Sequence, residues 1–567
     1  AGRMEGGLHA QLLAAAARDR WPGPNDASQI SLKWPDGFLP YAWGSRFFQW
    51  QSDRYGDSVI PGFIERTSRR LWPLTVSGPM KDAGGQGVGG AWRAIRDAWT
   101  DRAGASDSGA VIASGLYEEP RPRLSPDGRY LAYVHVDGRD DPRVVVRDLQ
   151  AGMEAWRHRI NAGVDLAWVD SALVVSQLDF SSPVEIRRRL YRWVPGAAWD
   201  PVPGSERLTR PFAAPGGGIA AVDLGAHASR VVNMPGREPL AAPPADAWAY
   251  IVQSPDGSWL AGSRHRNGQW DIVLWPPGRP QDAVEATRDA AVDDDPSWAP
   301  AGDRLLFTSE RGERGIPQIF AFQPADGSVE QLTWEPAGAR QPALTADGKL
   351  IYVTMRADGR ALVERPLPAG RPASASSRPA GPRGPAPAVA VRETGYAPWA
   401  SLRPHFWIPT WHDEGITGRF AGALTAGIDA VGRTNYVAHF AVSSRGRVEG
   451  LLDVEHQRWK ALSLTASVQQ TWDRARARVI VQQPVVDTIP VVLGERELLV
   501  GAGGVLRWRR WRSAVTARLA AQWQQDGLAI DSPPALRFTD PRTDYAGPSV
   551  SVGIQHVSQP ALAISPE

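Results

Sequence analysis

The chain has 567 residues, of which 43% are hydrophobic and 22% charged, a balance typical of a globular protein with several domains. The net charge is +2 and the basic residues are interspersed with acidic ones, so the sequence predicts no nucleic-acid partner. No run of eighteen apolar residues predicts a membrane-spanning helix, and the lack of cysteine excludes disulfides and thiolate metal sites. The 57 glycines, 49 prolines and 25 tryptophans favour turn-rich β structure.

Residues 1–105 are predicted to be a helical segment. Apolar side chains recur there at spacings of three and four residues, which is the period of an amphipathic helix. The pattern predicts helices at about 8–17, 40–54, from 58 onward, and 91–99. Gly56 directly follows the second of these and is a typical helix-terminating residue.

The stretch from Trp34 to Gly56 resembles the back half of gluzincin metallopeptidases, which are zinc enzymes with an HExxH helix. In the aminopeptidase branch, a Pro-Tyr-x-x-Gly motif at a helix start carries a tyrosine that stabilises the tetrahedral oxyanion. Pro40, Tyr41 and Gly44 match that motif. The resemblance implies that Tyr41 is the candidate catalytic residue, because a phenol opposite a metal shares the developing negative charge. The alternative is a buried helix-start aromatic whose hydroxyl meets a backbone group.

The zinc ligands of that family have no counterpart in this sequence. It contains no HExxH motif, and His9 is the only histidine among residues 1–105, without two convergent partners. We therefore expect no metal and no other cofactor in this chain, and no catalysis by it. The resemblance implies zinc only for a longer parent protein, and we expect the sequence to be truncated at both ends.

Residues 110–370 contain a repeated turn followed by an alternating strand. The four clear copies of the turn are Ser125-Pro126-Asp127-Gly128, Ser254-Pro255-Asp256-Gly257, Ala299-Pro300-Ala301-Gly302 and Thr345-Ala346-Asp347-Gly348. The third residue recurs at intervals of 129 (three steps of 43), 45 and 46. A period of this length is typical of a β-propeller blade.

Two weaker copies fill the gap between the first and second turns. They lie at Asp165–Val194 and at Leu208–Met234, and they bring the predicted total to six blades. The repeats resemble the TolB-type propeller family, with Ser-Pro-Asp-Gly and the outgoing Leu332-Thr333 as its marks. The resemblance implies a protein or peptide partner at the propeller.

Acidic residues of the repeats admit two interpretations. The run Asp293-Asp294-Asp295 fits either a calcium site or a solvated turn before Pro296, and the missing ligand spacing favours the turn. The carboxylates of Asp127, Asp256 and Asp347 are expected to form turns.

Residues 371–395 are rich in Pro, Ala, Gly, Ser and Arg. Such a segment buries too little apolar surface to order itself, so it is predicted to be an extended linker.

Residues 396–567 show long two-residue alternation. The pattern predicts strands at 417–429, 435–443, 448–456, and around 462–468, 515–523 and 549–555. Strands of nine to twelve residues with tryptophans near their ends suit a tilted bilayer span. The alternative is a soluble antiparallel barrel or sandwich with one wet face.

The opening of this region, from Tyr396 to Pro409 and then Gly427-Ile428-Asp429, resembles the barrel of bacterial surface-antigen proteins related to BamA. The resemblance implies a partial outer-membrane β-barrel of seven or eight strands, with lipid as its partner.

The sequence thus predicts a multidomain, mainly β chain: a short α-helical segment, a six-bladed propeller and a partial antiparallel barrel. We expect a bacterial envelope protein anchored in the outer membrane, with its soluble domains in the periplasm or at the surface and a propeller that binds protein or peptide. Two alternatives stay open. One is a non-catalytic scaffold with a relic of a peptidase, and the other is a barrel for translocation or insertion.

Overall fold

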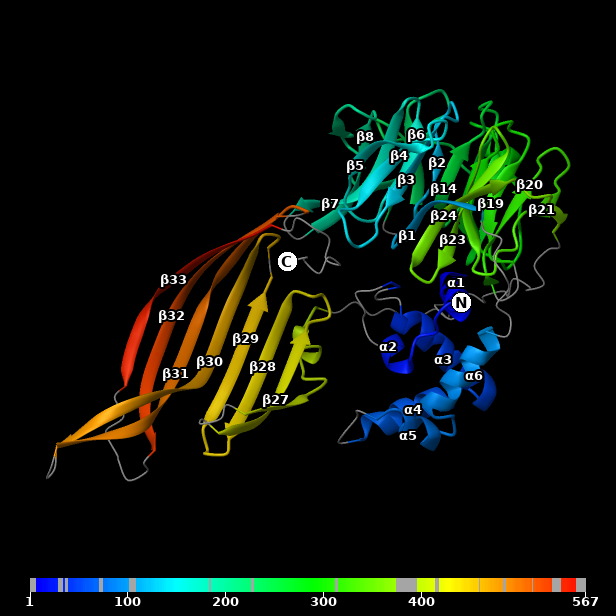
Figure 1. The fold of residues 1–567 in the computed structure, drawn as a ribbon. Coiled ribbons are helices and arrows are strands. Elements are labelled where there is room, and N and C mark those ends of the chain that lie inside the picture. The colour runs from blue at the N-terminus through cyan, green and yellow to red at the C-terminus, as the bar shows by residue number, and fades with distance from the viewer. Residues whose placement is uncertain are drawn as a thin grey trace. The chain divides into compact units, whose positions relative to one another are not determined.

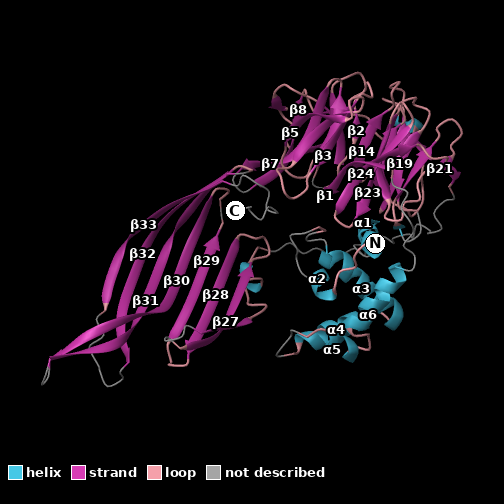
Figure 2. Cartoon of the chain, viewed as in Figure 1, coloured by secondary structure: helices cyan, strands magenta, loops and turns pink. Residues whose placement is uncertain are grey.

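The computed structural model describes residues 7–28, 34–35, 39–70, 75–100, 109–182, 185–225, 229–311, 315–373, 395–413, 418–457, 459–482, 486–511, 513–532 and 542–556. These residues fall into two compact units, one with the helical segment and the propeller and one with the C-terminal sheet. The α-helices of the described residues lie in the N-terminal part, and the rest is mainly strand with connecting loops and the short 3-10 helices Pro280–Asp282 and Pro398–Ala400 (Figure 2). Most of the predicted linker lies outside the described residues.

The helical segment contains the four predicted helices and two short ones that the periodicity did not predict. The helices are α1 (Gly7–Arg18), α2 (Pro24–Ser28), α3 (Leu39–Tyr55), α4 (Val59–Ser68), α5 (Ser77–Asp82) and α6 (Val88–Thr100). The apolar faces of α3, α4, α5 and α6 meet around Phe47, Val59 and Ile95. None of the described helices is long and apolar enough to cross a membrane.

Six antiparallel sheets form the propeller, which confirms the predicted blade number (Figure 1). In chain order the strands of the first three blades are β2 (Arg123–Leu124), β3 (Tyr130–His135), β4 (Arg143–Asp148) and β5 (Met153–Arg159); β6 (Asp165–Val169), β7 (Ala172–Ser182), β8 (Glu185–Trp193) and β9 (Trp199–Pro201); β10 (Leu208–Ala213), β11 (Ile219–Leu224), β12 (Ser229–Asn233) and β13 (Glu238–Pro239). Those of the next two are β14 (Ala247–Gln253), β15 (Leu260–Arg266), β16 (Gln269–Trp275) and β17 (Val284–Glu285); β18 (Asp293–Trp298), β19 (Leu305–Ser309), β20 (Gln318–Phe322) and β21 (Val329–Gln331), extended by β25 (Arg371–Pro372).

The last blade combines the two ends of the propeller segment. Its strands β22 (Ala339–Leu344), β23 (Lys349–Arg356) and β24 (Gly359–Pro366) are followed by β1 (Ala110–Leu116), which pairs antiparallel with β24 as the outermost strand. The strand that comes first in the sequence therefore closes the ring, and it leaves no gap between the first and last blades.

The repeated turns fold as the sequence predicts. The Ser125 hydroxyl donates to the Asp127 carboxylate, and that carboxylate accepts the backbone N–H of Arg129. Hydrogen bonds from Ser254 and Ser258 lower the pKa of Asp256 to about 2. The carboxylates stabilise the turns, as expected for these residue types.

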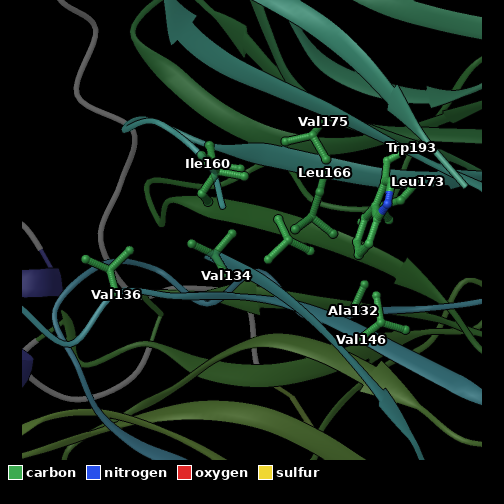
Figure 3. Packing of buried hydrophobic residues seen from close by; sticks show 11 residues of the cluster. Ala132, Val134, Val136, Val146, Ile160, Leu166, Leu173, Val175 and Trp193 are labelled. Atoms are coloured by element: carbon green, nitrogen blue, oxygen red, sulfur yellow. The ribbon is translucent and has the colours of Figure 1, made fainter. Parts of the chain in front are cut away.

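Apolar side chains between neighbouring blades form the core. Between the first two blades, the cluster contains Val134, Val146, Leu166, Leu173 and Trp193, all nearly inaccessible to solvent (Figure 3). Neighbouring blades cover both faces of a propeller sheet in this way, and some middle strands are buried along their whole length. The strands β19 and β20 have no exposed or half-buried residue.

Helix α1 packs against one end of the propeller. The backbone N–H of Gly7 donates to the Glu310 carboxylate at 3.2 Å, and the Gln11 side-chain amide donates to the Ala337 carbonyl at 2.9 Å. Leu12 and Leu13 share an apolar cluster with Ala337 and Met355 of the last two blades. This end of the propeller is opposite the repeated turns. Ala337 precedes β22, whose other end leads into a repeated turn, and Glu310 follows β19, which begins after a repeated turn.

The C-terminal unit is one antiparallel sheet of eight strands in chain order. The strands are β26 (Ile408–Asp413), β27 (Arg419–Ile428), β28 (Thr434–Ser443), β29 (Val448–His456), β30 (Leu462–Gln482), β31 (Val486–Arg509), β32 (Ser513–Ser532) and β33 (Thr543–His556). All six predicted strands are present, although β30 and β32 extend well beyond the alternation. The predicted partial barrel is not confirmed, because among the described residues the sheet is open, with β26 and β33 at its edges.

Candidate functional site: the axial funnel of the propeller

A cavity of about 670 Å³ opens along the propeller axis at the end that carries the repeated turns, and we call it the funnel. Its lining residues fall within 122–128, 165–170, 210–213, 250–255, 297–300 and 343–346, so every blade contributes. The last residues of the innermost strands and the turns that follow them lie around the axis and line the funnel. The volume lies within the range of about 300–1,000 Å³ that ligand pockets occupy.

Innermost strands of several blades carry a non-glycine residue in the left-handed region at the same place. The φ angles are 50° at Arg121 and Arg210, 51° at Asp295 and 55° at Gln341, and a proline follows each of these residues. The pairing register shifts next to three of them, in β10, β18 and β22. Such bulges re-aim a side chain, and a residue before proline normally avoids this conformation. Strain of this kind is concentrated at functional sites.

Three guanidinium groups surround the ring of Tyr250 in the floor of the funnel. The guanidinium carbon of Arg121 lies 5.0 Å from the ring centroid, that of Arg210 5.3 Å and that of Arg123 5.7 Å. The Tyr250 hydroxyl accepts a hydrogen bond from Arg121 and donates to Asp165 at 3.2 Å. A tyrosine face attracts cations, so the ring holds the three positive charges together.

Asp165 is the carboxylate that balances this group, and only 4% of it is exposed. It lies 3.2 Å from Arg121 and 3.5 Å from Arg188, and it accepts a hydrogen bond of 2.7 Å from Thr209. Burial alone would raise the pKa of Asp165, but the two arginines hold it below its ordinary value. The carboxylate is therefore ionised at neutral pH.

A second polar network fills the axis beneath the floor. The Gln341 side-chain oxygen accepts the backbone N–H of Arg121 at 2.8 Å, and its amide donates to Glu119 at 2.9 Å. Glu119 also binds Arg360 at 3.0 Å. These contacts link the first and last blades across the ring closure.

The acidic run Asp293-Asp294-Asp295 does not form the solvated turn that the sequence favoured. Asp293 and Asp295 are instead buried in β18. Arg311 lies 3.0 Å from Asp293 and Arg340 lies 3.7 Å from Asp295, so arginines balance the buried charges. No group of three or more acidic or histidine residues that could hold a metal occurs among the residues described.

Tyr41 lies in the first turn of α3, as the motif predicts, and 48% of it is exposed. The alternative of a buried helix-start aromatic is therefore wrong. His9 is buried in α1. The catalytic role of Tyr41 stays a prediction, and neither residue lines the funnel.

The funnel itself was missed by the sequence analysis. A signal was present: Arg121-Pro122, Arg210-Pro211, Asp295-Pro296 and Gln341-Pro342 place a polar residue before proline just upstream of the turn in four blades. A polar residue at an equivalent point of each repeat would be expected to face the axis, where the repeats converge.

A family model described as TolB beta propeller domain matches residues 228–373. The middle of the chain is a TolB-type six-bladed β-propeller. The match covers the last blades, whose repeats are the most regular, and the sheet topology extends the same fold to β1.

Solved structures with a similar fold include a TolB of Agrobacterium tumefaciens, 17% identical over 45% of this chain and 92% of its own, with a TM-score of 0.31. A gluconolactonase of Xanthomonas campestris is 16% identical over 46% of this chain and 88% of its own, with a TM-score of 0.34. The propeller domain of the Trilobed protease of Pyrococcus furiosus is 10% identical over 39% of this chain and 70% of its own, with a TM-score of 0.30. No curated protein matches the chain.

The substitution Asp165→Asn tests whether the axis of the TolB-type propeller depends on this carboxylate. It leaves Arg121 buried without its charge partner, which typically costs about 3–5 kcal/mol of unfolding free energy. We expect a loss of this order in urea unfolding followed by tryptophan fluorescence at pH 7. Asp303→Asn, which breaks an exposed ion pair with Arg304, is the matched control and should cost less than about 1 kcal/mol. Equal losses in the two variants would contradict the role of Asp165.

The pH dependence of stability offers a second prediction. Burial and the neighbouring Asp293 raise the pKa of Asp271 to about 7, and its Oδ1 atom is buried without a hydrogen-bond partner. The unfolded chain releases this proton near its ordinary pKa of 3.8, so this group lowers stability as the pH rises from about 4 to 7. Asp271→Asn should raise the urea midpoint at pH 8 and leave it nearly unchanged at pH 4. A midpoint that shifts equally at both pH values would contradict this assignment.

Proposed function

We propose that this chain is a bacterial envelope protein whose TolB-type propeller binds a segment of peptide or protein in the funnel. The observation that carries the proposal is the funnel itself, which combines apolar and aromatic walls with a charged floor. Leu124, Trp168, Phe212 and Trp298 contribute to the walls, whereas Arg123 and Arg210 reach the floor. Ligand sites typically have this composition, with apolar contacts for affinity and a few polar groups for orientation.

The second part of the proposal is that the C-terminal sheet faces lipid. Its register places every second residue of Val500–Trp508, Val515–Trp523 and Ala546–Ile554 on one face, with the ends of the three segments aligned. We call this face the apolar band. Leu464 and Val468 of β30 continue it, and large side chains along it such as Leu519 and Val550 are exposed.

The dimensions of the apolar band fit a bilayer. Each segment has nine residues, which lies within the about 9–11 residues that a tilted transmembrane strand needs. Trp523 lies at one edge of the band and Trp508 at the other. Aromatic residues at both edges are typical of membrane interfaces.

The opposite face of the same strands is polar. Arg518 pairs in register with Ser551, and Arg507 forms an ion pair of 2.7 Å with Glu455. One apolar and one polar face on long strands supports an outer-membrane anchor, with the propeller in the adjoining aqueous compartment.

A peptide library tests the binding role. We expect the full chain, immobilised in detergent, to retain members of a library of random N-acetylated hexapeptides. Trp168→Ala removes an aromatic wall of the funnel and should reduce retention about tenfold or more, because aromatic contacts dominate such sites. Trp334→Ala, an exposed tryptophan that does not line the funnel, is the matched control and should retain peptides normally. Retention that is absent, or that both variants lose equally, would refute the binding role.

Arginine substitutions on neighbouring positions of β33 test the membrane anchor. Val550 lies in the middle of the apolar band with 71% of it exposed, and Ser551 faces the other side. In phosphatidylcholine vesicles Val550→Arg should lower the unfolding free energy by about 2–4 kcal/mol, the usual cost of arginine at the bilayer midplane. Ser551→Arg should have little effect. Equal effects, or a wild-type chain that does not float with vesicles in a density gradient, would rule out the anchor.

A further inference from the structure

Two arginines in the funnel floor have no carboxylate partner. Arg123 donates to the Pro122 carbonyl at 3.0 Å, and Arg210 donates to the Trp248 carbonyl at 2.6 Å. Neither forms an ion pair with a residue that the structure describes. A guanidinium has five N–H donors, so each side chain keeps several for a ligand.

Guanidinium groups are concentrated in this floor. Three guanidiniums share the Tyr250 ring, and the carboxylate in contact with them is Asp165, which is already bound by Arg121, Arg188 and Thr209. Burial lowers the pKa of Arg123 and Arg121 adds to this effect, whereas Asp295, Asp165 and Asp294 oppose it. These carboxylates act from a distance, so within the described residues Arg123 and Arg210 have no direct ion pair.

The backbone holds these side chains in place. Arg210 occupies a left-handed position before Pro211, and Arg123 follows Pro122 at the start of β2. Both side chains line the funnel next to Tyr250. A site that is rigid before binding loses little entropy when a ligand arrives.

We propose that Arg123 and Arg210 bind the terminal carboxylate of a peptide whose last residues fill the funnel. This inference rests on the proposed peptide-binding function and specifies which end of the peptide the funnel takes. A planar carboxylate matches the fork of an arginine guanidinium and the N–H donors that the two arginines leave unused. The polar network of Gln341 and Glu119 occupies the axis beneath the floor, so a chain that enters past the turns ends there.

Walls and floor then act on different parts of the ligand. The carboxylate lies between the two guanidiniums, while the aromatic rings of Trp168 and Phe212 contact the last side chains. This arrangement selects an apolar C-terminal residue, because Asp127 and Asp170 at the rim disfavour further negative charge.

The experiment uses the full chain in detergent and two random N-acetylated hexapeptide libraries, one with free C-terminal carboxylates and one with C-terminal amides. We expect the free acids to be enriched about tenfold or more over the amides, since a hydrogen bond to a charged group contributes about 1.5–3 kcal/mol. Arg123→Gln and Arg210→Gln should each remove most of this preference. Arg157→Gln, an exposed arginine of the first blade, is the matched control and should preserve it.

The outcomes separate this inference from the proposed function. Equal enrichment of acids and amides would overturn the carboxylate site and leave peptide binding intact. Selective enrichment of amides that carry Asp or Glu would assign the floor to a side-chain carboxylate and overturn the terminal one. Retention of neither library would overturn the peptide-binding function and this inference with it. Since neither arginine forms an ion pair within the described part of the chain, both variants should unfold in urea close to the wild type, which shows that they fold.

Discussion

The ion pair between Arg121 and Asp165 sets the arrangement of the propeller axis. Asp165 lies at the start of β6, and its partners come from three further directions: Arg121 before β2, Thr209 in β10 and Tyr250 in β14. One buried carboxylate therefore fixes the first four blades relative to one another. Apolar packing between blades supplies most of the favourable free energy, but it does not specify which polar atoms meet at the centre. A buried charge does specify which polar atoms meet, because it is stable only when it is paired.

The same constraint explains why strained residues persist in the innermost strands. Left-handed residues before proline cost of order 1–3 kcal/mol each, and four of them occur in one domain. In return this backbone conformation brings Arg121, Asp295 and Gln341 into ionic or hydrogen-bonded contact inside the axis. Arg210 is different, because its strain brings a guanidinium to the floor without a carboxylate partner. Its hydrogen bond to the Trp248 carbonyl and its contact with the Tyr250 ring hold it there, and its remaining donors are available to the ligand that we propose.

Local patterns in the sequence predicted the elements that depend on local physics. The turn residues Ser125 and Asp127 make the contacts that their types favour, and strict alternation placed β27, β28 and β29 to within two residues. The buried state of Asp293 and Asp295 was not predictable in this way. An acidic run before proline is usually solvated. Its burial is tolerated here because Arg311, which follows β19, and Arg340 of β22 pair with the carboxylates. The funnel escaped prediction for the same reason, since its residues come together only when six repeats close into a ring.

The chain contains two kinds of strand, and their difference bears on the environment of each part. Strands of the propeller such as β20 are apolar on both faces, and both faces are covered by neighbouring blades. Strands β31, β32 and β33 alternate, and their apolar side remains exposed within the described residues, at Leu519, Val552 and Ile554 among others. Exposure of apolar surface to water costs about 25 cal/mol per Å², and contiguous patches this long are rare on soluble proteins. The two patterns therefore differ in what covers them: neighbouring blades cover the propeller strands, whereas lipid would cover the apolar band in the membrane anchor that we propose.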